Sequence, residues 1–448
     1  MTSGITPGML DGGLAEDLAT ASLAMARRFA RRATLWCVAP GWEPHAHHMA
    51  VEFVHPVIVG KRALPAFALT GPDLIPQAAV AVRPGDLVIA VAGGRNADVA
   101  NLMRQSSAGG AASFWIGSGR RPPAGSAGHV LWVDDADPMA PATGRFVLLY
   151  HLLWELTHVC FEHPGLLAEQ AATVGSDTGG SGTAGSGTGG SGSAAQRPTA
   201  GQEPRATGQE PQTARQEPQG TGFLYPFIDA EERDAGPLLA ALAVSARAKA
   251  AESAALQQAT LAAVADQVTA CGAAMAERFA DGGRLYAFGN GGSSTDCATF
   301  ATLFASPPAG GLDYRGLPAL NLAADQAVVT ALGNDVGFDL VFSRQIIAHA
   351  AARDIAVAFS TSGNSRDLMA ALREARGRGL LTVGFAGYDG GEMAASGDVD
   401  YCFVVRSQSI HRIQESQALL GYRLWESTQQ SFQKTMDRCV HPDAHNGP

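Results

Sequence analysis

The sequence predicts an α/β protein made of two doubly wound α/β/α sandwiches with parallel sheets, joined by a disordered linker. Three observations predict this fold. Strand-like apolar runs that end in small residues alternate with helix-like stretches on both sides of a low-complexity segment, an order typical of parallel sheets covered by helices. The sequence RALPAFAL at 62–69 resembles RGLPALNL at 315–322. A similar strand-like run also follows an aspartate in each half, DLVIAVAGG from Asp86 and DIAVAFSTSG from Asp354. The two halves therefore look like diverged copies of one unit.

The composition is that of a soluble protein with a well-filled core. Of the 448 residues, 46% are hydrophobic and 17% are charged. Acidic residues outnumber basic ones 42 to 32, which gives a net charge of −10. Such a chain gains no general attraction to nucleic acid from counterion release, so we expect no direct nucleic-acid partner.

The cysteines and the apolar stretches indicate a cytoplasmic protein. Six cysteines without a Cys-x-x-Cys pair argue against a disulfide framework and suit a reducing compartment. The N-terminus lacks the basic and apolar regions of a signal peptide. The longest apolar stretch, 146–161, is interrupted by His151, Glu155 and His158, so it is too short and too polar to span a bilayer.

The chain divides into four segments. They are a first domain at 1–171, a linker rich in Gly, Ser, Pro and Gln at 172–222, a second domain at 223–438 and a tail at 439–448. No apolar face recurs in the linker, so nothing there can offset the entropy cost of ordering. In the second domain, apolar spacings of three and four from Leu238 to Phe279 predict two long helices. The first domain has no counterpart of the stretch 330–345.

Two loops of the second domain are suited to binding a phosphate. FGNGGSSTD at 288–296 and FSTSGNSRD at 359–367 each follow a strand-like run and open a helix-like stretch. Glycines let the backbone approach an anion, and hydroxyls and helix N-terminal N–H groups donate to its oxygens. Tight turns with capping hydroxyls are the alternative interpretation.

Six motifs of the second domain resemble, in order, those of the sugar isomerase (SIS) domain family, and in particular those of phosphoheptose isomerases. The motifs are GNGGSSTD, LPALNLAAD, TALGNDVGFDLVFSRQ, STSGNS, LLTVGFAGYDGGEMA and HRIQES, within 236–432. The resemblance implies an SIS-type fold and a sugar-phosphate pocket. The residues that it implies as substrate-binding are Asn290, Gly291, Gly292, Ser293, Asn334, Asp335, Ser360, Thr361, Ser362, Ser365 and Gln414.

The metal site that the resemblance implies is missing from the second domain. The family isomerises sedoheptulose 7-phosphate with a zinc ion held by a His-x-x-x-Glu pair, a Gln, and a His eight residues after the Gln. The His, Glu and later His positions are Thr299, Leu303 and Tyr422 here, and only Gln414 remains. The second domain alone is therefore expected to be inactive.

The first domain shows the opposite pattern. Laid over the same template, it has His48 and Glu52 at the first two ligand positions and His151 at the third, with Thr143 at the Gln position. The spacing of four residues places His48 and Glu52 on one helix face. The phosphate loops are reduced in this half: APGW at 39–42 and AGGRNA at 92–97 replace them. His45 is a further, minor candidate ligand.

These complementary losses predict one composite site between the halves. The second half would hold the phosphate and supply Gln414, and the first half would supply His48, Glu52 and His151 to a zinc ion. Glu52 and His151 would be the catalytic residues, exchanging protons through an enediol. A phosphorylated sugar is then the expected ligand.

Two other interpretations remain open. A His-x-x-x-Glu pair arises by chance in many helices, and a histidine in an apolar helix is commonly a satisfied core residue. The protein would then be a non-catalytic sugar-phosphate binder that acts as a regulator or assembly factor, or a scaffold with vestigial loops. For self-association, the resemblance favours even-numbered assemblies, either a homodimer forming a pseudo-tetramer or a tetramer.

Overall fold

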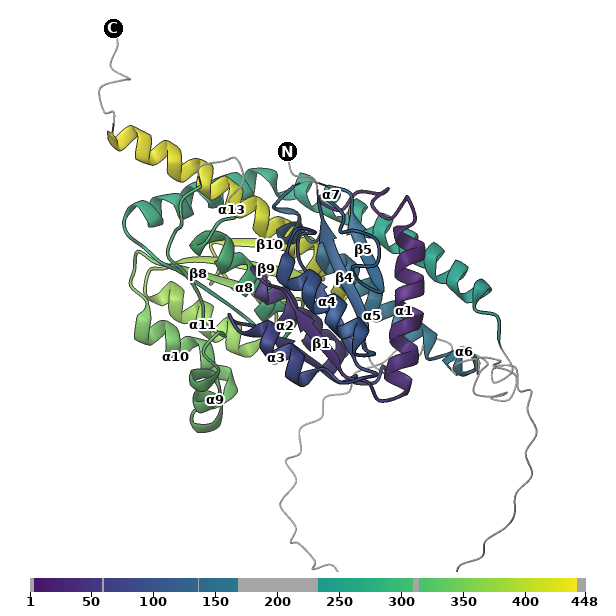
Figure 1. The fold of residues 1–448 in the computed structure, drawn as a ribbon. Coiled ribbons are helices and arrows are strands. Elements are labelled where there is room, and N and C mark those ends of the chain that lie inside the picture. The colour runs from purple at the N-terminus through teal and green to yellow at the C-terminus, as the bar shows by residue number, and fades with distance from the viewer. Residues whose placement is uncertain (1–3, 59, 136, 168–232, 309–313, 441–448) are drawn as a thin grey trace, which may run out of the picture.

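The computed structural model confirms two α/β units with parallel sheets. It describes residues 4–58, 60–135, 137–167, 233–308 and 314–440. The predicted linker at 172–222, and the tail from residue 441 on, lie outside the described residues. The first sheet is formed before residue 168 and the second after residue 232, and each is covered by helices (Figure 1).

The first sheet has the strand order β2-β1-β3-β4-β5, with every pair parallel. Its strands are β1 (Leu35–Val38), β2 (Ala66–Leu69), β3 (Leu87–Val91), β4 (Ala112–Ser118) and β5 (His129–Val133). Its helices are α1 (Leu14–Ala30), α2 (Glu43–Val54), α3 (Leu74–Ala81), α4 (Ala97–Ala108), the 3₁₀ turn η1 (Ala140–Thr143), α5 (Arg145–Cys160) and α6 (Pro164–Leu167). Helices α1, α2 and α5 share a core with one face of this sheet, and α3 and α4 cover the other face. Because both faces are covered, β3 is buried at every position.

The second sheet has the order β10-β9-β8-β6-β7, again all parallel. Its strands are β6 (Leu285–Gly289), β7 (Ala319–Asn321), β8 (Ile355–Phe359), β9 (Leu381–Gly387) and β10 (Tyr401–Val405). Its helices are α7 (Gly236–Ala280), α8 (Gly292–Ala305), α9 (Gln326–Asp335), the 3₁₀ turn η4 (Phe338–Leu340), α10 (Val341–His349), α11 (Arg366–Gly377), α12 (Gly391–Ala395) and α13 (Ile410–Val440).

The two sheets share one topology. From its edge strand, the second sheet runs β7-β6-β8-β9-β10, so each strand occupies the same place as its counterpart in the first sheet. The repeated Leu-Pro-Ala motif begins the edge strand in both, with Ala66 opposite Leu35 and Ala319 opposite Leu285. The insertion that the sequence places in the second half alone forms α9, η4 and α10.

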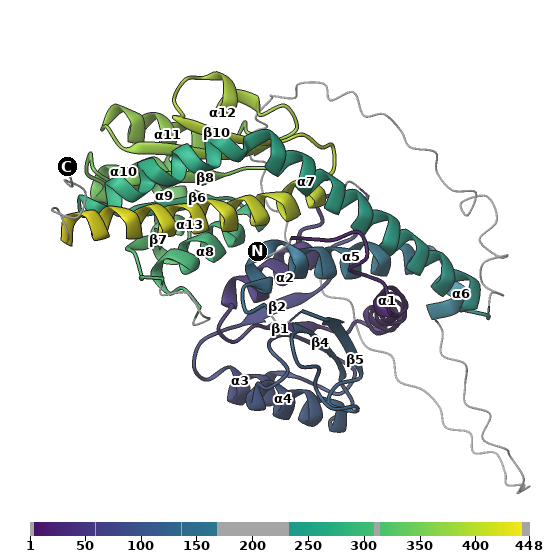
Figure 2. The same ribbon diagram turned by 90° about the horizontal axis from the view of Figure 1, so that it is seen from above.

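The stretch from Leu238 to Phe279 forms one helix of 45 residues, α7, so the expectation of two helices is wrong. No proline interrupts it after its first turn, and Gly272 marks a close approach rather than a break. A Cβ at Gly272 would lie 2.4 Å from Ser427 Oγ of α13. Helices α7 and α13 pack side by side (Figure 2). The first part of α7 packs in the core of the first half and its last part in the core of the second.

By length and apolar composition, α7 is the one helix in the described part of the chain that could cross a membrane. One third of its most apolar 18-residue stretch is buried in the protein. Core helices of soluble proteins meet the same criterion, so α7 is weak evidence for a membrane span.

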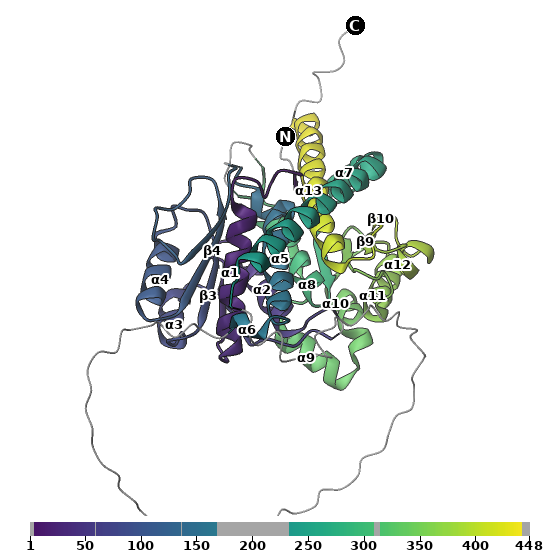
Figure 3. The same ribbon diagram turned by 90° about the vertical axis from the view of Figure 1, so that its right-hand side faces the viewer.

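The helices that carry the predicted metal residues meet between the two halves. Helix α2 packs against α8, and α5 packs against α13. Viewed from the side, the sheets lie on opposite sides of these helices (Figure 3). The fold therefore brings segments from both halves to one place.

Candidate functional site

Helix α2 presents His48 and Glu52 from the first half. Pro44 in its first turn suits a helix start, because proline has no N–H that would need a partner there. Four residues later than His48, Glu52 lies on the same face, with His48 Nε2 and Glu52 Oε1 3.6 Å apart. Each residue is only 2% exposed. The helix therefore places an imidazole and a carboxylate together in the interior.

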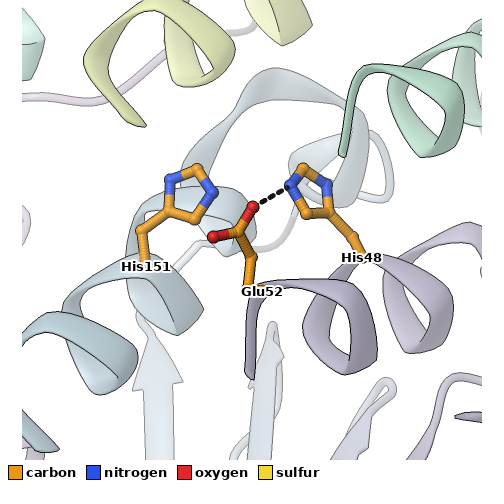
Figure 4. Close-up of side chains that lie close together, drawn as sticks. All are labelled: His48, Glu52 and His151. Atoms are coloured by element: carbon orange, nitrogen blue, oxygen red, sulfur yellow. Dashed lines mark ion pairs between the residues drawn. The ribbon is translucent and has the colours of Figure 1, made fainter. Parts of the chain in front are cut away.

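Helix α5 brings His151 to the same point. Its side chain is fully buried, and one ligand atom each from His48, Glu52 and His151 lie within 4.8 Å of one another. Figure 4 shows the three side chains converging from two helices. The structure thus brings together the three residues that the sequence predicts as metal ligands in the first half.

Gln414 of the second half reaches this cluster. A Cβ built on Gly292 would lie 2.3 Å from Gln414 Nε2, 3.1 Å from His48 Nε2 and 3.2 Å from Glu52 Oε1. These three side chains therefore surround the same glycine, at the start of α8. The backbone of the first predicted phosphate loop therefore lies directly against the cluster, with no side chain between them.

Three polar side-chain atoms of the cluster and of Gln414 lack hydrogen-bond partners. Among the described residues, His48 Nε2, His151 Nε2 and Gln414 Oε1 are buried and make no hydrogen bond. A buried polar atom left unpaired costs about 1–3 kcal/mol. Imidazole nitrogen and carboxyl or amide oxygen are ligands of divalent metal ions. With Glu52, this donor set fits a metal ion, which would satisfy all three atoms.

Two acidic residues that the sequence analysis did not assign lie behind the histidines. Asp296 Oδ1 is 3.5 Å from His48 Nδ1, and Glu415 Oε1 is 3.0 Å from His151 Nδ1. Both acids belong to motifs that carry the family resemblance. Their pairing with histidines of the other half could not be read from the motifs alone.

His411 and Glu155 also escaped the sequence analysis. His411 Nε2 is 3.3 Å from Glu52 Oε2, and its Nδ1 is 2.6 Å from Glu155 Oε1. The His411 ring stacks on His151 with centroids 4.3 Å apart. A signal existed for each: Glu155 follows His151 by four residues, and His411 precedes Gln414 by three, so each pair shares a helix face.

Burial and neighbouring charges shift the pKa values in opposite directions. Burial raises the pKa of Glu52, but its hydrogen bond with His411 and the nearby His48 and His151 rings outweigh burial and hold that pKa well below its usual range. Burial lowers the pKa of His151 to about 4, helped by the charge of His411. For His411, burial lowers the pKa, yet its bonds to Glu155 and Glu52 raise it to about 9. Burial raises the pKa of Asp296 to about 6, although His48 opposes the change.

Negative charge is in excess around the cluster. The carboxylates of Glu52, Glu155 and Glu415 pair with His411, Arg412 and Lys249, and a fourth carboxylate, Asp296, lies beside His48 with no such cation. Unbalanced buried charge is costly. A bound cation would reduce this imbalance.

The two predicted phosphate loops lie next to each other. They follow β6 and β8, which are neighbours in the sheet, and they open α8 and α11. Asn290 Nδ2 of the first loop donates to Asp367 Oδ2 of the second at 2.8 Å. Helix N-termini at the carboxyl ends of parallel strands are favourable anion sites.

The second loop is held to the helix that carries Gln414. Gln417 Nε2 donates to the Ser360 carbonyl at 2.8 Å, and Ser360 Oγ accepts the Gly363 N–H at 2.9 Å. The other predicted residues of the two loops have these exposures: Ser293 is buried, and Asn290, Gly292, Thr361, Ser362 and Ser365 are partly exposed, while Gly291 is exposed. The loops are thus anchored and open to a ligand.

Asn334 and Asp335 lie elsewhere. Both are exposed on α9, a helix with no buried residue, and Asn334 Nδ2 donates to Asp335 Oδ1 at 2.7 Å. Within the described residues, no hydrogen bond or ion pair joins either of them to the cluster. Their predicted contact with substrate therefore stays a prediction. His45 faces Tyr150, its Nδ1 3.4 Å from the hydroxyl, and is not part of the three-residue cluster.

The positions in the second half where the family has metal ligands line a separate cavity, whose lining also includes His45 and Asp296. Thr299, Leu303 and Tyr422, which stand where the family has metal ligands, line one cavity of about 20 Å³ together with Ala142, next to Thr143. Thr299 Oγ1 donates to the Thr295 carbonyl, and leucine offers no donor atom. This cavity, which we call the sister cavity, has no pair equivalent to His48 and Glu52.

Comparison with known proteins places the likeness in the second half. The SIS domain family matches residues 250–387. The phosphoheptose isomerase of Solidesulfovibrio magneticus is 42% identical over 160 residues, which are 36% of this chain and 76% of that protein. That of Burkholderia pseudomallei is 40% identical over 162 residues, 36% of this chain and 78% of that protein.

Two solved structures are similar to parts of this chain to different extents. The phosphoheptose isomerase of Neisseria gonorrhoeae is 34% identical and covers 40% of this chain and 96% of its own, with a TM-score of 0.37. The C-terminal domain of glucosamine-fructose-6-phosphate aminotransferase from Francisella tularensis covers 94% of both chains at 10% identity, with a TM-score of 0.48.

Proposed function

The chain belongs to the SIS family, with the phosphoheptose isomerases as its relatives, and from this premise we propose that it interconverts an aldose and a ketose phosphate. The substrate we propose is sedoheptulose 7-phosphate or a closely related sugar phosphate. The reaction would take place at one site between the two halves of the chain.

One observation carries the proposal. Buried, unpartnered Nε2 atoms of His48 and His151 lie beside Glu52, and the amide of Gln414, from the other half of the chain, lies next to them with its own Oε1 unpartnered. A satisfied core histidine would have partners for both ring nitrogens, whereas each of these has one open Nε2. This favours a site over chance placement.

In the proposed reaction, the loops of the second half bind the phosphate and residues of the first half transfer protons. The loops at 290–296 and 360–365 would hold the phosphate through backbone N–H groups and hydroxyls. Glu52 would accept the proton from the carbon next to the sugar carbonyl, which leaves an enediol, and His151 would exchange the hydroxyl proton. Glu52 would then return the proton to the neighbouring carbon of the enediol. No proton is gained or lost overall, so the reaction needs no other reactant.

The donor set also fits zinc, which we propose as the cofactor. His48, Glu52, His151 and Gln414 would hold it. When bound, zinc would supply Lewis-acid polarisation of the sugar carbonyl.

The direct test is turnover of sedoheptulose 7-phosphate by the purified full chain in the presence of zinc. We expect conversion by the wild type and a fall in kcat of at least about 100-fold in Glu52→Gln, because general-base catalysis contributes about 10²–10⁴. Glu162→Gln is the matched control, since Glu162 is 63% exposed and pairs with Lys61. Its kcat should equal that of the wild type.

A non-catalytic binder is the second candidate. The second half favours it, because this half keeps the phosphate loops but has Thr299, Leu303 and Tyr422 at the ligand positions. A zinc-loaded wild type that binds the sugar phosphate without converting it would support this candidate and contradict the enzyme.

A further inference from the structure

We infer that Asp296 and Glu415 are positioning residues, by which the second half fixes the orientation of the two histidines that the first half supplies. The inference rests on the proposed metal site and adds a role for the second half beyond the phosphate loops and Gln414.

The contact between Glu415 and His151 sets which ring nitrogen faces the cluster. Glu415 Oε1 lies 3.0 Å from His151 Nδ1, and both side chains are fully buried. An ionised carboxylate can only accept a hydrogen bond, so Nδ1 must carry the proton and donate. The lone pair of the neutral ring is then on Nε2, the atom that has no partner.

Glu415 is itself held rigidly. Arg412 donates to both of its carboxylate oxygens, at 2.6 and 2.5 Å. Ser253 Oγ of α7 donates to Oε2 at 2.5 Å, and Gln257 Nε2 of the same helix donates to the Glu415 carbonyl at 2.8 Å. The orientation of His151 is thus tied to α13 and α7, both in the second half.

Asp296 lies behind His48 in a similar way, at a longer distance. Its Oδ1 lies 3.5 Å from His48 Nδ1, it is 6% exposed, and it belongs to α8. His48 Nε2 faces Glu52 and has no hydrogen bond. Each histidine of the first half therefore has a carboxylate of the second half behind its Nδ1 and an open Nε2 in front.

This arrangement has a measurable consequence. Metal-bound histidines usually donate their other N–H to a carboxylate or carbonyl, and loss of that partner typically weakens metal binding by about 10–100-fold. Both partners here come from the half that does not carry the histidines. Metal affinity should therefore depend on acids that never touch the metal.

The test compares Asp296→Asn and Glu415→Gln with Asp354→Asn in the full-length protein. Asp354 is a matched control. It is a buried acid of the second half, directly before β8, and it accepts hydrogen bonds from the backbone N–H groups of Arg284 and Ala351. The readouts are the zinc Kd from competition with a chelator, the visible spectrum of the cobalt(II) form, and thermal unfolding without metal.

We expect the zinc Kd to rise about 10–100-fold in the two variants, with an altered cobalt(II) spectrum, and to stay within about threefold of the wild type in the control. Because Glu415→Gln leaves Arg412 without its counter-charge, Glu415→Asp serves as a second variant that keeps the charge but moves it away from His151. It should also weaken zinc binding.

The outcomes separate the two proposals. A wild type that binds neither zinc nor cobalt would overturn the proposed metal site and this inference with it. Tight binding by the wild type, with an unchanged Kd and spectrum in Asp296→Asn and in either Glu415 variant, would overturn only the positioning roles.

Discussion

Gly292 shows how a missing side chain shapes the site. It occupies the first position of α8, and a Cβ there would come within 3.2 Å of Gln414, His48 and Glu52. Its backbone angle φ is not in the left-handed region, so alanine would suit the backbone. Glycine is therefore required at this position because the three neighbouring side chains leave no room for a Cβ.

Gly292→Ala should preserve the fold and weaken metal binding. The new Cβ would lie 2.3 Å from Gln414 Nε2, the end of a flexible side chain, so Gln414 would move out of the cluster. We expect the zinc Kd, measured by chelator competition, to rise at least about tenfold.

Gly377→Ala in α11 is the control for this substitution. Nothing lies within 4 Å of a Cβ at that position, so alanine there should leave the Kd unchanged and stabilise the protein by about 0.4–1 kcal/mol. Equal zinc affinity in the two variants would contradict the role given to Gly292.

At this scale the sequence predicts which residues of the first half cluster better than it predicts the acids and the histidine behind them. His48, Glu52 and His151 could be placed by a template with fixed spacing within each helix. Asp296, Glu415 and His411 act across the interface between α8, α13, α5 and α2. Their partners are more than 100 residues away in the chain, and no local spacing encodes them.

Among the elements, α7 shows where local patterning falls short. Apolar spacing of three and four predicts helix, but it does not say whether 45 residues form one helix or two. In the structure the continuous helix packs along α13, with a close approach at Gly272 and Ser427. The strands, by contrast, were predictable, because buried parallel strands form short, nearly continuous apolar runs.

Gly272→Ala should destabilise the packing of α7 on α13. The added Cβ would lie 2.4 Å from Ser427 Oγ and 2.8 Å from its Cβ, and overpacking of this kind costs about 1–3 kcal/mol. Ser427→Gly removes both atoms, so the double variant should recover part of the loss. The measurement is the urea midpoint of unfolding; a double variant no more stable than Gly272→Ala would contradict the contact.

Asp400 links β10 to β9 and should make stability depend on pH. Burial raises its pKa, but the Thr382 N–H, at 3.0 Å, and Arg376 outweigh burial and lower it. A depressed folded pKa contributes stability above the unfolded pKa of about 3.9, and this contribution is lost as the pH falls through the folded pKa.

Asp400→Asn should therefore lower stability at pH 6 and reduce the further loss between pH 5 and pH 3. Urea unfolding at a series of pH values measures both effects. The pH dependence of the wild type persisting unchanged in this variant would contradict the assignment.

For the whole molecule, the sister cavity fixes the stoichiometry. Its lining has Thr299, Leu303 and Tyr422 at the family's ligand positions, and among the described residues His48, Glu52 and His151 are the one cluster of three potential ligands, so one ion per chain is expected where the repeated fold would allow two. Elemental analysis of zinc-loaded, desalted protein should give about one zinc per chain, and His48→Ala should reduce this to near zero. Two zinc ions per chain would contradict the asymmetry.

Zinc should also couple the unfolding of the two halves. The proposed ligands come from α2, α5 and α13, so the ion would bind only when both halves are folded and docked. At 100 times its Kd, a ligand stabilises the folded state by about 2.7 kcal/mol. Calorimetry should show one transition that moves to higher temperature with zinc; two transitions of which zinc shifts only one would contradict a shared site.

The identical strand order of the two sheets has a consequence for how the protein can change over time. In a symmetric pair of separate chains, every mutation occurs twice and affects both sites equally. Once the two copies are joined in one polypeptide, each is encoded separately and can drift by itself. Leucine can then replace an acid in one copy while the acid at the equivalent place in the other is kept under selection, and a duplicated gene can lose half of its catalytic residues without losing the reaction.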